Sequence, residues 1–411
     1  LPGGGWAFIA GQIEAEKNHA FKYNGDGPDK IANLSGVEIS IWPNYNWWQT
    51  LSTVKQVDTA AKTIRLTDEL SYTIEPGRRY FLQNAMEFLD APGEWFYDHT
   101  KKVLYFWPPA DLTEKSQVIA PDGDCVIKAT GVQAVNFIGI NVACAYNDGV
   151  VLKDCKDVLF ARAQVRNTYG FGIIVEGGES VRLHGNDIFA TGKGGITLTG
   201  GDRKTLTPGN HEAVNNHIHH YAQIWNTYNC AVNINGVGNR VQHNLIHDAP
   251  HIGILLTGNE HVIEYNDIHH VCMEGADNGG FYMGRDWTQR GNVVRYNKFH
   301  DIYGFGTNGP DKEGVVKYEA PFQAWGVYLD DCTSGTKIYG NIFYRVPLCG
   351  VMVGGGRDNI VENNIFSECT PAYHIDDRWD AYPWALMQER LDAMNYKNPP
   401  YSERYPELLT M

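Results

Sequence analysis

Asn244-Leu-Ile-His-Asp248 and Gly253-Ile-Leu-Leu-Thr-Gly258 form one unit of a repeat, and Asn266-Asp-Ile-His-His270 with Gly280-Phe-Tyr-Met-Gly284 forms the next. Each unit has an apolar pair before the asparagine, then any residue, an Ile or Phe, a polar break, and a glycine that opens an alternating strand. The asparagine recurs at 186, 216, 244, 266, 297, 341 and 364, mostly at intervals of 22 to 31 residues. The strands have an apolar period of two, which excludes the 3.6-residue period of helical repeats.

A repeat of this length, with short strands and a fixed asparagine, predicts an all-β fold, a right-handed parallel β-helix. One coil cannot bury its apolar face alone and must stack on the next. The asparagines are expected to stack as a ladder, with side-chain amides bonded to each other and to the turn backbone. A leucine-rich repeat would need leucine at fixed positions, whereas these coils vary between Val, Ile, Leu and Met.

The repeat does not cover the ends of the chain. Residues 1–130 contain aromatic-rich strands and a hairpin over 94–107, which predict a small antiparallel β-sandwich-like module, preceding or inserted into the first coils. The β-helix is expected over 131–377. Residues 378–411 are expected to cap the open end of the solenoid, because an uncapped end exposes a sheet edge.

The composition of the 411-residue chain excludes several classes of function. The formal net charge is −14, so nucleic acid is not an expected partner. No apolar run reaches the roughly 18 residues of a membrane span. The chain starts at Leu1 without a leader, which indicates a processed or trimmed chain. The eight cysteines are scattered and are expected to be buried thiols.

Alternation along the strands separates inward from outward side chains. Aligning the coils pairs Tyr282 with Tyr328 on the outward face, and places Asp330 between Gly284 of the preceding coil and Gly354 of the next. Neighbouring coils lie about 4.8 Å apart, so carboxylates at the same height come close together. Crowded carboxylates raise the pKa of one of them, as acid catalysis on a glycosidic bond requires.

The site prediction follows from this alignment. The candidate catalytic residues are Asp286, Asp330, Asp331, Glu274 and Asp277. The candidate substrate-binding residues are Tyr282, Arg285, Trp287, Tyr328, His251, His374, Asp376, Asn233 and Thr257. Strand-ending aspartates that bond the turn backbone are the competing explanation for any single member of the group.

Histidines also recur, at 219, 247, 269 and 300, each three residues after a ladder asparagine. We expect them to stack because the coil repeats, and we expect neither a metal site nor a cofactor, since a metal site needs convergence of ligands. An acidic solenoid is compatible with a structural Ca²⁺ ion, but no spacing demands one.

The segments 275–287, 326–331, 89–98 and 104–109 resemble bacterial β-helix carbohydrate enzymes, and most closely glycoside hydrolase family 141, with its α-L-fucosidases and xylanases. The resemblance implies a secreted or periplasmic enzyme that cleaves a plant or algal polysaccharide by carboxylate catalysis. We expect a monomer whose partner is a polysaccharide or oligosaccharide.

Two alternatives stay open at this point. A polysaccharide lyase would cleave a uronate polymer such as alginate or pectin by β-elimination, and it needs a base and a cation to neutralise the uronate carboxylate. Arg285, Tyr282, Tyr328 and His251 could serve. A non-catalytic glycan-binding solenoid would keep the aromatic residues and tolerate loss of the aspartates.

Overall fold

The computed structural model describes residues 5–378 and 384–410 and divides the chain into two compact units. The first contains 1–119 and 306–319, and the second 120–305 and 320–411. The sequence placed a boundary at 130, but β9 (Cys125–Thr130) already pairs with β12 (Asp148–Lys153) of the second unit. The segment 306–319 interrupts the repeat as a long insertion and adds a two-stranded ribbon, β31 (Gly306–Thr307) and β32 (Tyr318–Glu319), to the first unit.

Six strands of the first unit form a closed barrel in the order β1-β2-β5-β4-β3-β6. The predicted antiparallel module is thus confirmed, and its strands close on themselves instead of leaving two open sheets. Their bounds are β1 (Ala7–Gln12), β2 (Ala20–Tyr23), β3 (Glu38–Ile41), β4 (Thr50–Asp58), β5 (Thr63–Leu66) and β6 (Arg79–Gln83). The predicted hairpin is β7 (Trp95–Asp98) with β8 (Val103–Phe106).

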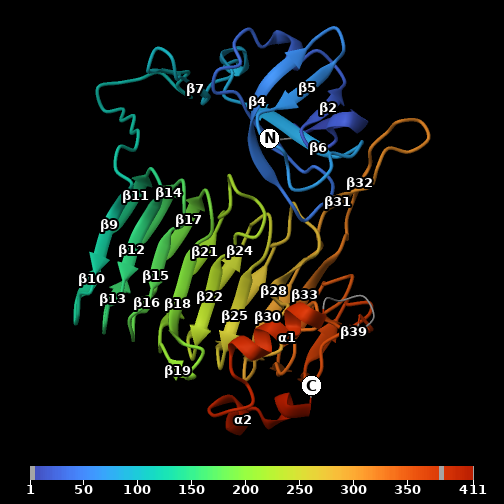
Figure 1. Cartoon of the computed structure of the whole chain (residues 1–411). Helices are drawn as coiled ribbons and strands as arrows, with labels where there is room; N and C mark the ends of the chain where they lie inside the picture. The colour runs from blue at the N-terminus through green and yellow to red at the C-terminus, as the bar shows by residue number, and fades with distance from the viewer. Residues whose placement is uncertain (1–4, 379–383, 411) are drawn as a thin grey trace. The chain divides into compact units, whose positions relative to one another are not determined.

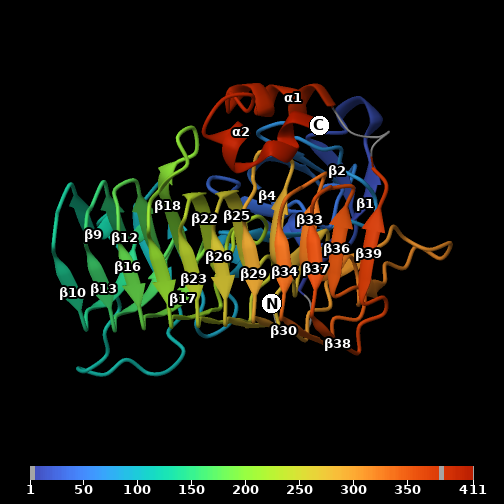
Figure 2. The ribbon, with the colours of Figure 1, turned by 90° about the horizontal axis from the view of Figure 1, so that it is seen from below.

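The second unit is a parallel β-helix whose coils stack side by side (Figures 1 and 2). Its largest sheet contains β9, β12, β15 (Ile173–Glu176), β18 (Ile196–Asp202), β22 (Val232–Val237), β25 (Ile254–Asn259), β28 (Asn278–Gly284), β33 (Ala324–Asp330), β36 (Val351–Gly354) and β39 (Tyr373–Asp376), with β19 (Thr207–Pro208) paired to β18.

The two other sheets each run through nine coils of the described chain. One contains β10 (Asn136–Ile138), β13 (Leu159–Ala161), β16 (Arg182–His184), β20 (Glu212–Val214), β23 (Arg240–Gln242), β26 (Val262–Glu264), β29 (Val293–Arg295), β34 (Lys337–Tyr339) and β37 (Ile360–Glu362). The other contains β11 (Asn141–Ala145), β14 (Gln164–Thr168), β17 (Asp187–Thr191), β21 (His217–His219), β24 (Leu245–His247), β27 (Asp267–His269), β30 (Lys298–His300), β35 (Ile342–Tyr344) and β38 (Ile365–Ser367).

The core of the β-helix consists of the inward residues of successive coils, such as Leu198, Ile234 and Met283, which are at most 2% exposed. The strand register agrees with the predicted alignment: Tyr282 pairs with Tyr328, and Gly284 pairs with Asp330. All eight cysteines are free, and five of them are buried. No helix of the described residues is long and apolar enough to cross a membrane.

The asparagine ladder is confirmed. Along all seven residues, each side-chain amide donates to the carbonyl oxygen of the next asparagine at 2.8 to 3.0 Å. Each of these asparagines also bonds the turn backbone; the Asn244 amide, for example, donates to the Ala213 carbonyl. The ladder satisfies buried polar groups at a turn where no strand could pair them.

We expect Asn244→Ala to lower the free energy of unfolding by at least about 3 kcal/mol, because several buried donors and acceptors on both neighbouring coils lose their partners. Asn244 bonds Asn216 on one side and Asn266 on the other. Asn364→Ala is the matched control with a smaller loss, since Asn364 ends the ladder and bonds a ladder neighbour on one side only. Urea unfolding measures both, and equal losses would contradict the cooperative role of the ladder.

The C-terminal segment contains α1 (Trp384–Ala393), α2 (Tyr401–Arg404) and η4 (Pro406–Thr410). It packs against the side of the coils instead of their open end: Met387, Tyr401 and Leu408 share a buried cluster with Trp287 and Cys332. In the last coil, by contrast, Ile365 and Ile375 are 61% and 58% exposed. The prediction that this segment caps the open end is therefore wrong. The segment packs on the side of the coils, where it buries the apolar turn residues that follow β28 and β33.

Candidate active site

The outward face of β28, β33, β36 and β39 holds the residues that the alignment predicted. Tyr282, Tyr328, Met352 and His374 follow one another in register across the four strands. The alignment places Gly354 beside Asp330, and because glycine has no side chain, open space was expected next to the Asp330 carboxylate. The structure fills this space: a Cβ atom on Gly354 would lie 2.6 Å from the guanidinium carbon of Arg378.

Arg378 is the residue that sequence reasoning missed. Its guanidinium group lies 2.5 Å from Asp330 Oδ1, 3.2 Å from Asp331 Oδ1 and 3.0 Å from Asp376 Oδ2, and it donates to the Tyr328 hydroxyl at 3.3 Å. The signal was present, since Arg378 follows Asp376 by two residues and continues the alternation of β39 on the same face. Arg378 thus neutralises part of a crowded group of carboxylates.

Asp330 and Asp331 are held rigidly. Asp330 is 3% exposed and accepts hydrogen bonds from the Tyr282 hydroxyl at 2.7 Å and from the Asp331 backbone N–H at 2.9 Å. Asp331 lies beside Arg285, with a distance of 2.5 Å between its Oδ2 and the Arg285 Nε. Arg378 thus contacts both carboxylates, and Arg285 adds a second cation beside Asp331.

Asp277 differs from them in its surroundings. It lies in the turn before β28, and its carboxylate accepts a hydrogen bond from the Tyr328 hydroxyl at 3.1 Å. Burial, and next the negative charge of Asp330, raise the pKa of Asp277 to about 6. Burial and the Asp330 charge also raise the pKa of Tyr328 well above its ordinary value, so its hydroxyl stays protonated. Asp277 can therefore carry a proton at mildly acidic pH, in the range around its pKa.

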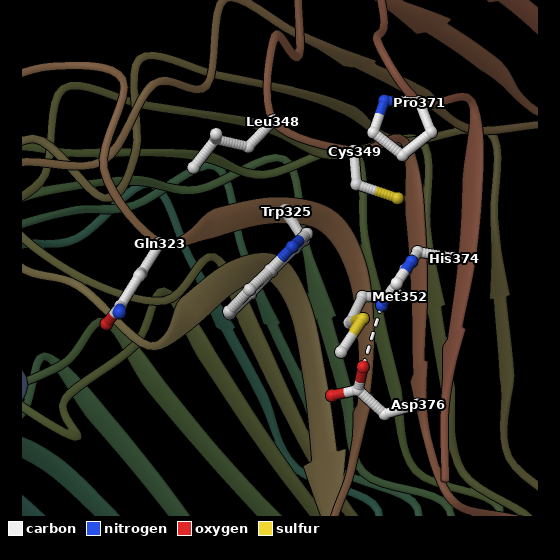
Figure 3. A pocket seen from close by; sticks show the side chains of 8 residues that line it. All are labelled: Gln323, Trp325, Leu348, Cys349, Met352, Pro371, His374 and Asp376. Carbon is white, nitrogen blue, oxygen red and sulfur yellow. Dashed lines mark hydrogen bonds and ion pairs between the residues drawn. The ribbon is translucent and has the colours of Figure 1, made fainter.

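A pocket of about 360 Å³ opens beside this group (Figure 3). Its lining residues are Gln323, Trp325, Leu348, Cys349, Met352, Pro371, His374 and Asp376. The Trp325 ring lies 4.2 Å from that of Tyr328, and His374 Nε2 lies 2.7 Å from Asp376 Oδ1. Burial alone would raise the pKa of Asp376, but hydrogen bonds from His374 and Arg378 outweigh it and hold that pKa below its ordinary value.

Asp286 and Trp287 lie outside this group. Asp286 is 6% exposed, and its carboxylate bonds the Thr288 N–H and hydroxyl and lies 3.3 Å from Arg203. Trp287 is 4% exposed within the cluster of the C-terminal segment, so its ring is not a platform for a ligand. The chain turns directly after Gly284, and the strand alternation behind the prediction no longer applies there.

We expect Asp286→Asn to lower the free energy of unfolding by about 1–3 kcal/mol, because the turn loses a charged acceptor and Arg203 loses its ion pair. The kcat on a cleaved substrate should stay within about threefold of wild type. Urea unfolding and steady-state kinetics on one preparation measure both values. A loss of kcat above a hundredfold at unchanged stability would return Asp286 to the catalytic group.

Of four further predicted residues, one is buried and three are half-buried. His251 is fully buried, its Nδ1 accepts from the Tyr228 N–H at 3.3 Å, and burial lowers its pKa to about 3, so it cannot touch a substrate. Glu274 is half-buried in the turn before Asp277. Asn233 and Thr257 are half-buried on β22 and β25, on the same face but on earlier coils.

A metal ion has no evident place in this group. Among the described residues, the cluster with metal-ligand spacing is Asp187 with His217 and His219, which belongs to β17 and β21 of another sheet. The candidate active site therefore offers one carboxyl group with a raised pKa, further carboxylates, an imidazole and an indole ring.

Two family models match the chain. Residues 230–378 match the model described as "Right handed beta helix region", and residues 73–109 match the "GH141 insertion domain". The chain is thus a right-handed parallel β-helix protein, as predicted. Within that class it resembles glycoside hydrolase family 141, whose insertion-domain model matches the end of its first unit.

One solved structure supports the fold, and two others give only lower-scoring alignments. A protein described as "Glycoside hydrolase" aligns with a TM-score of 0.61 and 15% identity, over 89% of this chain and 74% of its own. The A-module of the mannuronan C-5 epimerase of Azotobacter vinelandii gives a TM-score of 0.39 and 14% identity, over 62% and 77%. The family 136 lacto-N-biosidase of Eubacterium ramulus gives 0.25 and 12%, over 55% and 51%. No curated protein matches the sequence.

Proposed function

We propose that the protein is a glycoside hydrolase that cleaves a polysaccharide or oligosaccharide by carboxylate acid/base catalysis on the outward face of β28, β33 and β39. Asp277 is the general acid, and Asp376 is the ionised carboxylate that acts as base or nucleophile. The family 141 resemblance supports the class of reaction. The contacts and burial of the group support these two roles.

The observation that carries the proposal is the separation of two carboxyl pKa values in one contiguous network. The pKa of Asp277 is raised to about 6, mainly by burial and then by Asp330, whereas the pKa of Asp376 lies below its ordinary value. Tyr328 and Arg378 link the two, since Tyr328 bonds Asp277 and Arg378 bonds both Tyr328 and Asp376. Two carboxyl groups whose pKa values are shifted in opposite directions in this way can act as the acid and the base of the reaction.

The pocket supports a sugar as the substrate. Trp325 lines the pocket, and an indole ring can pack its face against the C–H surface of a pyranose ring. His374 and Asp376 supply hydrogen-bonding groups beside it. An apolar wall with a few polar groups at one end is typical of small-ligand sites.

The contacts favour hydrolysis over β-elimination. A lyase needs a cation to neutralise a uronate carboxylate. Here Arg378 is shared among three aspartates, and Arg285 is paired with Asp331. The raised pKa of Tyr328 keeps its hydroxyl protonated, so Tyr328 is not available as a base, and His251 is buried. A polymeric substrate would further imply action outside the cytoplasm, which we propose with the function.

A panel of neutral and uronate polysaccharides tests the proposal. The protein is incubated with each, while reducing ends and the ultraviolet absorbance of unsaturated uronates are followed together. We expect new reducing ends without that absorbance on at least one substrate. Growing absorbance would replace the hydrolase with a lyase, and binding without turnover on every substrate would leave a glycan-binding solenoid.

A further inference from the structure

A second group of polar side chains lies on another sheet of the β-helix, on the neighbouring strands β17 and β21 (Figure 1). Asp187 and His217 are partners in register, and His219 follows on the same face of β21. The three side chains are half-buried, so solvent ions can reach them. The sequence predicted that the histidines would only stack, and it did not include Asp187.

The three potential ligand atoms converge. Asp187 Oδ1 lies 3.1 Å from His217 Nδ1 and 3.4 Å from His219 Nε2, and all three atoms lie within 4.8 Å of one another. In a tetrahedral Zn²⁺ site with bonds of about 2.0–2.1 Å, ligand atoms are about 3.3–3.4 Å apart. The Asp187 Oδ1 atom is enclosed and accepts no hydrogen bond from the described residues.

A row of three close contacts runs from Asp187 through His217 and His247 to Asp248. His217 Nε2 lies 2.7 Å from His247 Nε2, and His247 Nδ1 lies 2.7 Å from Asp248 Oδ2. Two neutral imidazoles supply two N–H groups, and the row has three contacts. If His247 donates to the Asp248 carboxylate, His217 must donate to His247. The Nδ1 lone pair of His217 then lies 3.1 Å from Asp187 Oδ1, and either a bound metal ion or a further proton would offset their repulsion.

His219 provides the third potential ligand atom. The Nδ1 atom of His219 lies 2.7 Å from Nδ1 of His220. If His219 carries its proton on Nδ1, its Nε2 has a free lone pair, 3.4 Å from the same Asp187 oxygen.

We propose that Asp187, His217 and His219 form a site for a divalent transition-metal ion, with Zn²⁺ as the best match, that joins two coils of the β-helix. Two imidazole nitrogens and one carboxylate oxygen suit Zn²⁺ and disfavour Mg²⁺ and Ca²⁺. His247 and Asp248 are positioning residues, because they fix the tautomer of His217 in the manner of an outer ligand shell. The side-chain amide of Gln164 donates a hydrogen bond to Oδ2 of Asp187 at 3.3 Å.

The site lies apart from the proposed active site, so it is tested without any substrate. Protein without a polyhistidine tag is stripped with a chelator and titrated with Co²⁺ and Zn²⁺. Wild type should bind one equivalent, show the visible spectrum of tetrahedral Co²⁺, and gain thermal stability with Zn²⁺ but not with Mg²⁺. Asp187→Asn, which is nearly isosteric, and His219→Ala should abolish the spectrum. Asp248→Asn should weaken Zn²⁺ binding by about 10–100-fold.

His269→Asn is the matched control, because His269 stacks in the same histidine row at 4.9 Å from His247 but lies outside the three ligands. It should bind Co²⁺ like wild type. Circular dichroism of the metal-free variants checks that each is folded. A wild-type chain that binds no Co²⁺, or an equal spectrum in folded Asp187→Asn, would overturn the proposal and leave a proton shared between His217 and Asp187.

Discussion

Replacing Asp277 with asparagine is expected to lower kcat/KM by about 10²–10⁴-fold, the usual contribution of a positioned general acid. Asparagine keeps the shape and still accepts a hydrogen bond from Tyr328, but it cannot give a proton to the leaving oxygen. The loss is measured by steady-state kinetics on the substrate that the panel identifies. A substrate with an activated leaving group, which needs little protonation, should lose much less.

The stability of Asp277→Asn separates a catalytic from a structural role. Because the folded chain raises this pKa from 3.8 to about 6, the folded state holds the proton more tightly, and wild-type stability falls as the pH rises through that window. At pH 8 the neutral asparagine avoids a buried charge, and the free energy of unfolding should rise by up to about 3 kcal/mol. Lower stability together with normal kcat/KM would make Asp277 a structural residue.

Arg378→Gln is expected to have the largest effect on stability, about 3–5 kcal/mol, because Asp330, Asp331 and Asp376 lose the cation that they share. The positive charge of Arg378 also lowers the pKa of Asp277. Without it that pKa rises, the acid stays protonated to higher pH, and the alkaline limb of the pH profile of kcat/KM should move upward. Urea unfolding and a pH profile measure the two effects.

Arg378→Lys is the matched control for the charge. It should return the alkaline limb toward wild type but recover only part of the stability, since an ammonium group cannot bond three carboxylates as the planar guanidinium does. An unchanged alkaline limb in Arg378→Gln would show that the acid of the reaction lies elsewhere.

The sequence determined the β-helix because its signals are local and repeated. Alternation in Gly326-Val-Tyr-Leu-Asp330 fixes which side chains face the core, and a slip by one residue would bury Tyr328 and Asp330 in it. The register of Tyr282, Tyr328, Met352 and His374 could therefore be derived coil by coil, and the structure confirms it. The asparagine ladder follows from the same repetition.

The parts that could not be predicted lie where the repeat ends. Asp286 and Trp287 follow β28 across a turn, and their directions depend on Arg203 and on the C-terminal helices, which no periodicity connects to them. Arg378 comes after the last strand, in a stretch that composition assigned to a cap. Asp277 was one acid among several, because its raised pKa depends on burial, which sequence alone does not give.

The mass of the newly formed chain ends tests the central claim most directly. Hydrolysis adds one water to each cleaved bond, whereas β-elimination adds none and leaves a double bond. Mass spectrometry of the oligosaccharides released in ¹⁸O-water should show one labelled oxygen per cleavage with wild type, and no such product with Asp277→Asn at the same exposure. Products lighter by one water, or labelled products that Asp277→Asn forms at the wild-type rate, would contradict the account.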